Sequence, residues 1–101
     1  MPPRSRPLAI GVLHVGDDAS LRGRTDARIA LALYANDEGY ALLDTIEVGR
    51  GWLADNAGYA CFKDLAARND PDAVIVSGPV DRPRIEDVAL RLRLVVHEVR
   101  G

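Results

Sequence analysis

The chain contains little cysteine, few aromatic residues and almost no lysine. Its 101 residues include one cysteine, one tryptophan, one phenylalanine and three tyrosines. A single cysteine, Cys61, excludes a disulfide within the chain and a zinc site built from cysteine pairs. We expect Cys61 to be a small buried apolar residue of a helix. His14 and His97 do not stand at metal-ligand spacing with it, so the sequence predicts no metal and no cofactor.

A long apolar run and an excess of charge are also missing. No stretch approaches the roughly 20 apolar residues of a membrane helix, and the N-terminus lacks the pattern of a secretory signal. We therefore expect a cytoplasmic protein with no membrane partner. The formal net charge is −2 and the isoelectric point is about 5.6. This balance argues against a protein that binds nucleic acid through bulk positive charge.

What is present is the composition of an ordinary globular domain. Hydrophobic residues make up 48% of the chain and charged residues 28%, which is usual for a folded domain. Residues 1–7 carry three prolines and two arginines and are expected to form a flexible tail. Residues 8–101 are expected to form a single domain.

Apolar runs and apolar residues at helical spacing alternate along this domain. The runs predict strands over 8–15, 40–48, 73–77 and 94–99. The spacing predicts helices over 25–38, 57–68 and 83–92, with Pro83 in the first turn of the last one. Strands that alternate with helices favour right-handed crossovers and parallel pairing. We therefore predict an α/β fold of three layers, with a four-stranded, mostly parallel sheet and the order β-α-β-α-β-α-β.

The first predicted strand runs into a Gly-Asp-Asp turn at residues 16–18. In such folds, ligands gather just past the carboxyl ends of strands, which makes His14 and the pair Asp17–Asp18 candidates for chemistry. Adjacent carboxylates could hold Mg²⁺. However, the third strand ends in Ser77–Gly78 rather than in another carboxylate. This favours the interpretation of two solvated loop acids.

Several motifs, in this order, resemble the catalytic domain of the serine recombinases, the resolvase and invertase family. The sequence AIGVLHVG at 9–16 resembles the family's A-I-G-Y-x-R-V-S, and ANDEGYAL at 35–42 resembles A-x-x-x-G-Y-x-L. The pair DAVIV at 72–76 and VDRPR at 80–84 resembles D-x-V-V-V followed by L-D-R-L-x-R. The resemblance covers roughly residues 8–99 and implies a resolvase-like fold.

The departures from the family pattern bear on function. Gly16 stands where the family has its nucleophilic serine, and His14 stands where it has an arginine. Asp81 and Arg82 match the start of the family's last motif. The final arginine of that motif would fall at Ile85 in this sequence, so Arg84 is displaced from it by one position. The family's long dimerisation helix and helix-turn-helix domain have no counterpart in this sequence. The resemblance thus implies a degenerate, truncated domain that has lost recombinase chemistry.

Two small groups of polar residues are candidate sites. Asp81, Arg82 and Arg84 are candidates for an inherited anion-binding site, the alternative being a helix start in which Asp81 caps and Arg82 is solvated. Ser20 could replace the missing nucleophile if His14 and Arg82 converge with it. The alternative for Ser20 is a helix cap.

Three hypotheses of function follow. The first is a catalytically inactive domain that acts through self-association, as a homodimer, or through protein binding, with a regulatory role. Edge strands or an apolar patch would supply the contact. Arg50 and Trp52 are further candidates for partner binding, the alternative for Trp52 being a lid that folds back on the core. The second is residual phosphoryl-transfer or hydrolase activity at the turn after the first strand. The third is DNA binding without catalysis, for which the candidates are Arg4, Arg6, Arg22, Arg24 and Arg50.

Overall fold

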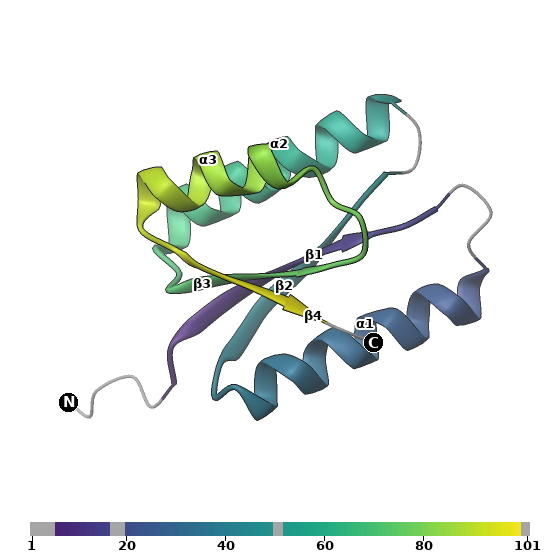
Figure 1. The fold of residues 1–101 in the computed structure, drawn as a ribbon, viewed down its shortest axis with the longest axis horizontal. Coiled ribbons are helices and arrows are strands. Elements are labelled where there is room, and N and C mark those ends of the chain that lie inside the picture. The colour runs from purple at the N-terminus through teal and green to yellow at the C-terminus, as the bar shows by residue number, and fades with distance from the viewer. Residues whose placement is uncertain (1–5, 17–19, 50–51, 100–101) are drawn as a thin grey trace.

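Strands and helices alternate through the whole of the described chain (Figure 1). The structure is a computed structural model and describes residues 6–16, 20–49 and 52–99, with the backbone alone at 52–55. The elements are β1 (Leu8–His14), α1 (Leu21–Asp37), β2 (Ala41–Val48), α2 (Trp52–Asn69), β3 (Ala73–Ser77), α3 (Arg82–Leu92) and β4 (Val95–Val99).

The four strands form one sheet in the order β2-β1-β3-β4, and every neighbouring pair is parallel. The predicted α/β fold class is therefore confirmed. The chain steps outward from β1 to β2 and then crosses back to β3 on the other side of β1. The point where the strand order reverses thus lies between β1 and β3, which is the place where open α/β sheets usually bind ligands.

Helices cover both faces of the sheet, α1 on one side and α2 with α3 on the other (Figure 1). On the α1 side, Leu31 packs with inward residues of β1 and β3 such as Leu13 and Ile75. On the other side, Phe62 and Ile85 belong to a larger buried cluster. Gly11 permits the close approach of α1, because a Cβ there would lie 2.7 Å from Cδ2 of Leu31.

Two helices begin earlier than the sequence predicts. Helix α1 begins at Leu21 rather than near Thr25, because Ser20 caps it: the Ser20 hydroxyl accepts a hydrogen bond of 3.0 Å from the Gly23 N–H. Helix α2 begins at Trp52, so the predicted start at residue 57 is wrong. Asp55 and Asn56 are residue types that often cap a helix, but neither excludes a helical backbone, and α2 passes through both.

The expectation that Cys61 is buried is also wrong. Cys61 is exposed, although its neighbour Phe62 is fully buried. The inward face of α2 is set by Tyr59, Phe62 and Ala66, at spacings of three and four residues. A residue one position away is rotated by about 100° around the helix, which turns the Cys61 thiol toward solvent.

Candidate functional site

The carboxyl edge of the sheet, where the sequence places its candidate chemistry, closes tightly around His14. A Cβ on Gly49 would lie 2.7 Å from Cδ2 of His14, and a Cβ on Gly78 would lie 3.1 Å from its Cβ. Both glycines also have positive φ, 92° and 80°, which favours glycine on backbone grounds. The turns after β2 and β3 therefore pack against the His14 side chain at the end of β1.

Asp81 forms the start of α3. Its carboxylate accepts a hydrogen bond of 3.4 Å from the Arg84 N–H, as an N-cap residue does. Its own N–H donates to the Tyr59 hydroxyl at 2.6 Å. Asp81 therefore fixes the beginning of α3 and ties it to α2.

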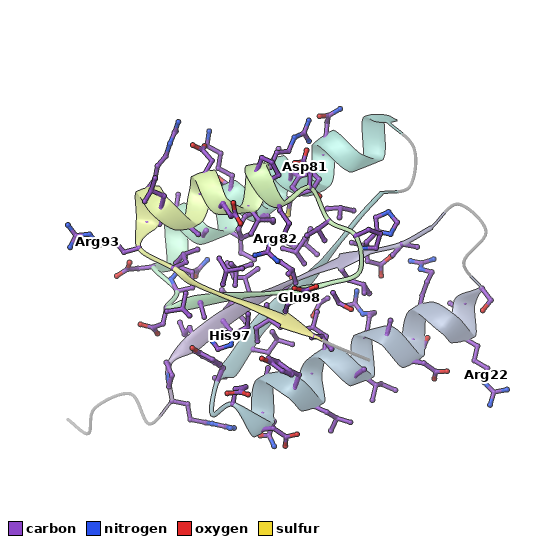
Figure 2. All side chains as sticks on the ribbon, viewed as in Figure 1. Arg22, Asp81, Arg82, Arg93, His97 and Glu98 are labelled. Carbon is purple, nitrogen blue, oxygen red and sulfur yellow. The ribbon has the colours of Figure 1, made fainter. Side chains whose placement is uncertain are left out.

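Arg82 is directed along the sheet toward β4, and Figure 2 shows it with Glu98. Its guanidinium contacts Oε2 of Glu98 at 3.3 Å and Oε1 of Glu86 at 3.4 Å. Two carboxylates surround one guanidinium, so the cluster as a whole carries negative charge. An anion would have to displace one of these carboxylates to bind Arg82.

Arg84 lies on a different side of α3 from Arg82. It forms an ion pair of 3.3 Å with Asp81 and donates a hydrogen bond of 2.8 Å to the Asn56 side chain. Its guanidinium also stands 4.9 Å from the centre of the Tyr59 ring, within cation–π range. The three residues of the predicted anion site therefore do not turn their polar groups toward one point.

The proposed catalytic trio is likewise dispersed. Ser20 uses its hydroxyl to cap α1, and Arg82 is bound by glutamates of α3 and β4. Within the part of the chain that the structure describes, no hydrogen bond joins any two of His14, Ser20 and Arg82. The geometry that residual catalysis at this edge requires is not present in these contacts.

Two of the arginines proposed for DNA binding, Arg24 and Arg6, are engaged near opposite ends of α1. Near the start of α1, Arg24 binds Glu47 of β2, and Arg28, which was not among the candidates, binds the same carboxylate at 2.9 Å. Burial alone would raise the pKa of Glu47, but hydrogen bonds from both arginines, together with their charges, outweigh burial and hold this pKa below its ordinary value. Near the end of α1, Arg6 donates to the side chain and the carbonyl of Asn36, at 3.0 and 2.9 Å.

Arg22 is the exception among the described arginines of this group. It is exposed and extends away from α1 (Figure 2). Arg4, Arg50 and the Asp17–Asp18 pair lie outside the described residues, as does the side chain of Trp52. The partner-binding prediction for Arg50 and Trp52 therefore stays a prediction.

A polar cluster that the sequence analysis missed lies between α1 and the sheet. The hydroxyl of Tyr40 is 2.9 Å from Nε2 of His97, and that of Tyr34 is 3.4 Å from Nδ1. Both rings meet the imidazole edge-on, at centroid distances of 5.2 and 6.0 Å. Burial, with the nearby charges of Asp72 and Glu38 and a contribution from Tyr34, raises the pKa of Tyr40.

This cluster joins α1, the start of β2 and the edge strand β4. Both imidazole nitrogens of His97 have hydroxyl partners, which fits a contact that positions elements rather than a base with a free nitrogen. One signal in the sequence was available. Tyr34 follows the apolar Leu31 at helical spacing, and His97 alternates with Val96 and Glu98 in its strand, so each side chain could have been assigned to a face of its element.

Large apolar side chains are exposed on α1, at Leu43 of β2 and around β4. On the outer side of α1, Ile29 is 53% exposed and Leu33 is 59% exposed, one helical turn apart. Around β4, Leu90 of α3 is 83% exposed and Val95 is 55% exposed. A shallow apolar groove lies between α3 and β4, lined by Glu86, Ala89, Leu90, Arg93, Leu94 and Val96.

The described residues contain no group of three or more histidine, cysteine, aspartate or glutamate side chains that could hold a metal ion. None of the helices in the described ranges is long and apolar enough to cross a membrane.

Comparison of the chain with protein-family models, with curated proteins and with solved structures gives no match. The resemblance to serine recombinases therefore stays a prediction that rests on the motifs in the sequence.

Proposed function

We propose that this chain is a non-catalytic α/β domain that acts by associating with a second copy of itself. The observation that carries the proposal is the exposure of apolar side chains on both sides of the edge strand β4, with Leu90 on the α3 side and Val95 on the α1 side. Single exposed apolar residues are common on protein surfaces and need no explanation. Exposed apolar residues that flank an open strand edge on both faces are typical of an interaction surface.

The polar residues of the predicted sites support the same proposal. A serine nucleophile needs an activating base or a surrounding group of cations, whereas Ser20 caps a helix. Arg82 and Arg84 are engaged by Glu98 and Asp81. Gly16 also carries no side chain where the recombinase motif has its serine. Within this proposal, the domain is an inactive, resolvase-like scaffold with a regulatory role.

The test is the mass of the full chain in solution as a function of concentration. The monomer mass is 10.9 kDa. Analytical ultracentrifugation from low micromolar to near-millimolar concentration is expected to show a reversible equilibrium between this species and one of twice its mass. A chain that stays strictly monomeric over this whole range would refute self-association.

The same preparation addresses the two alternatives. Titration with duplex DNA at low salt is expected to show no binding, since most of the described candidate arginines are paired within the chain. Incubation with model phosphodiesters is expected to release no product. Salt-sensitive DNA binding, or turnover that is lost in Ser20→Ala, would favour one of the alternatives instead.

A further inference from the structure

The two edges of the sheet are built differently. At the β2 edge, the pairing with β1 shifts by one residue at Leu43, and the strand also carries the exposed Asp44. Bulges and charges of this kind protect an edge from pairing with another strand. At the other edge, β4 reads Val-Val-His-Glu-Val and pairs with β3 without a break. The β4 edge is therefore the less protected of the two.

The backbone of β4 can accept a further strand. The Val95 N–H donates to the Asp72 carbonyl at 3.0 Å, so residue 95 directs its polar backbone groups toward β3. Because these groups alternate along a strand, Val96 and Glu98 direct theirs to the outer edge. Among the residues that the structure describes, no strand pairs with this side of β4.

The surroundings of this edge are apolar on both faces of the sheet. On the α3 side, Val96 and the exposed Leu90 both line the groove. On the α1 side, Val95 lies opposite Ala73 in the register and is more than half exposed. A strand added at the edge would cover these side chains as well as satisfy the open backbone groups.

We propose that two copies of the chain associate through β4, edge to edge and antiparallel, so that one sheet continues through both copies. This inference rests on the proposed function and names its surface. An isologous pair is the commonest form of self-association in soluble proteins. The complementary charges of Arg93 and Glu98 near the two ends of β4 favour a second copy of this chain as the occupant of the edge.

The charges at the two ends of β4 decide the direction of pairing. Arg93 directly precedes the strand, and its side chain makes no ion pair with the described residues and extends away from the domain (Figure 2). Glu98 lies near the other end of the strand, half exposed. Antiparallel pairing brings each Arg93 to the Glu98 end of the other copy, whereas parallel pairing would set like charges side by side.

The test compares Glu98→Pro with Glu98→Ala in the full chain. Both variants lack the Glu98 carboxylate that contacts Arg82, so the loss of this contact affects both of them equally. Only proline removes the outward N–H and places a ring against the incoming strand. We expect the dimer dissociation constant of Glu98→Pro to exceed that of Glu98→Ala by at least about tenfold. Circular dichroism checks that both variants remain folded.

A third variant separates this inference from the proposed function. The double substitution Ile29→Glu and Leu33→Glu on α1 is expected to leave the dissociation constant unchanged. If Glu98→Pro still dimerises as well as Glu98→Ala does, the β4 interface is refuted, and self-association stands. If the unsubstituted chain never dimerises, both proposals fail.

Hydrogen exchange gives a second measurement that needs no variant. As the concentration of the unsubstituted chain rises into the dimeric range, the amides of Val96 and Glu98 are expected to become protected. Those on the outer side of α1 should not change. Dimerisation without protection at residues 96 and 98 would overturn the inference even if Glu98→Pro fails to fold.

Discussion

Replacing Arg93 with glycine should make the domain more stable and its dimer weaker. Arg93 follows the end of α3 with φ 58° and ψ 46°, and the next N–H, of Leu94, closes the helix by donating to Ala89 at 2.8 Å. This left-handed position is one that glycine usually occupies. A side chain in this conformation costs the folded state about 1–2 kcal/mol. Glycine avoids that cost but destabilises the folded state by about 0.5–1 kcal/mol, because it loses more conformational freedom on folding.

The difference between these two costs gives the expected size of the effect. Arg93→Gly should raise the free energy of unfolding of the monomer by about 0.75 kcal/mol, the difference between the midpoints of the two costs, measured by urea denaturation at a concentration below the dimer range. This corresponds to a rise in Tm of about 3–6 °C. The two-fold dimer loses two contacts between Arg93 and Glu98, each worth about 0.2–1 kcal/mol at an interface rim. Their loss should raise the dissociation constant about 2- to 30-fold.

Asp70 supplies the matched control, because it is the other described non-glycine residue with positive φ, at 48°. Asp70→Gly should also stabilise the monomer, by less, since aspartate tolerates this conformation better than arginine does. It should leave the dissociation constant unchanged. The reasoning is wrong if Arg93→Gly lowers stability, or if it raises stability with no effect on association.

Three further predictions test local features of the fold by chemical denaturation. Gly58→Ala should destabilise the domain by about 1 kcal/mol despite the helix preference of alanine, because the new Cβ would lie 2.7 Å from Cγ1 of Val48; a gain in stability would contradict this packing. Glu47→Gln should cost about 1 kcal/mol at neutral pH. Because the folded-state pKa of Glu47 is lowered, its carboxylate stabilises the fold fully above the unfolded pKa and loses this effect as the pH falls through the folded pKa. The free energies of unfolding of Glu47→Gln and of the unsubstituted chain should therefore converge in acid. A difference between them that stays constant with pH would contradict this role of Glu47. Ser20→Ala should cost about 1 kcal/mol and Ser20→Asp much less, as expected for a cap; equal stability of all three chains would exclude that role.

The strands of the core could be predicted closely from the sequence. The run Ala73–Ser77 is almost wholly apolar and is buried on both faces of the sheet, so period and composition agree. The start of α1 could not be predicted as well. Its first turn exposes Leu21, so it carries no inward apolar residue, and only the cap at Ser20 marks where the helix begins.

The partners of the site residues could not be predicted, because they depend on strand pairing. The sequence places Arg82 at the start of α3 but does not show that Glu98, sixteen residues later, returns beside it. In the same way, Tyr34 and His97 are 63 residues apart in the chain and meet only because α1 packs across the sheet toward β4. Local pattern fixes the elements, whereas these contacts follow from their order in the sheet.

The contact between Arg82 and Glu98 connects the family resemblance with the proposed interface. If the Asp81–Arg82 pair derives from a recombinase motif, its arginine now holds a glutamate of the edge strand instead of facing the turn after β1. That contact restrains the Glu98 side chain at the end of β4 that would meet Arg93 of the second copy. Arg82 would then act as a positioning residue for association. Arg82→Ala should therefore weaken the dimer in the unsubstituted chain but have little effect when Glu98 is already alanine.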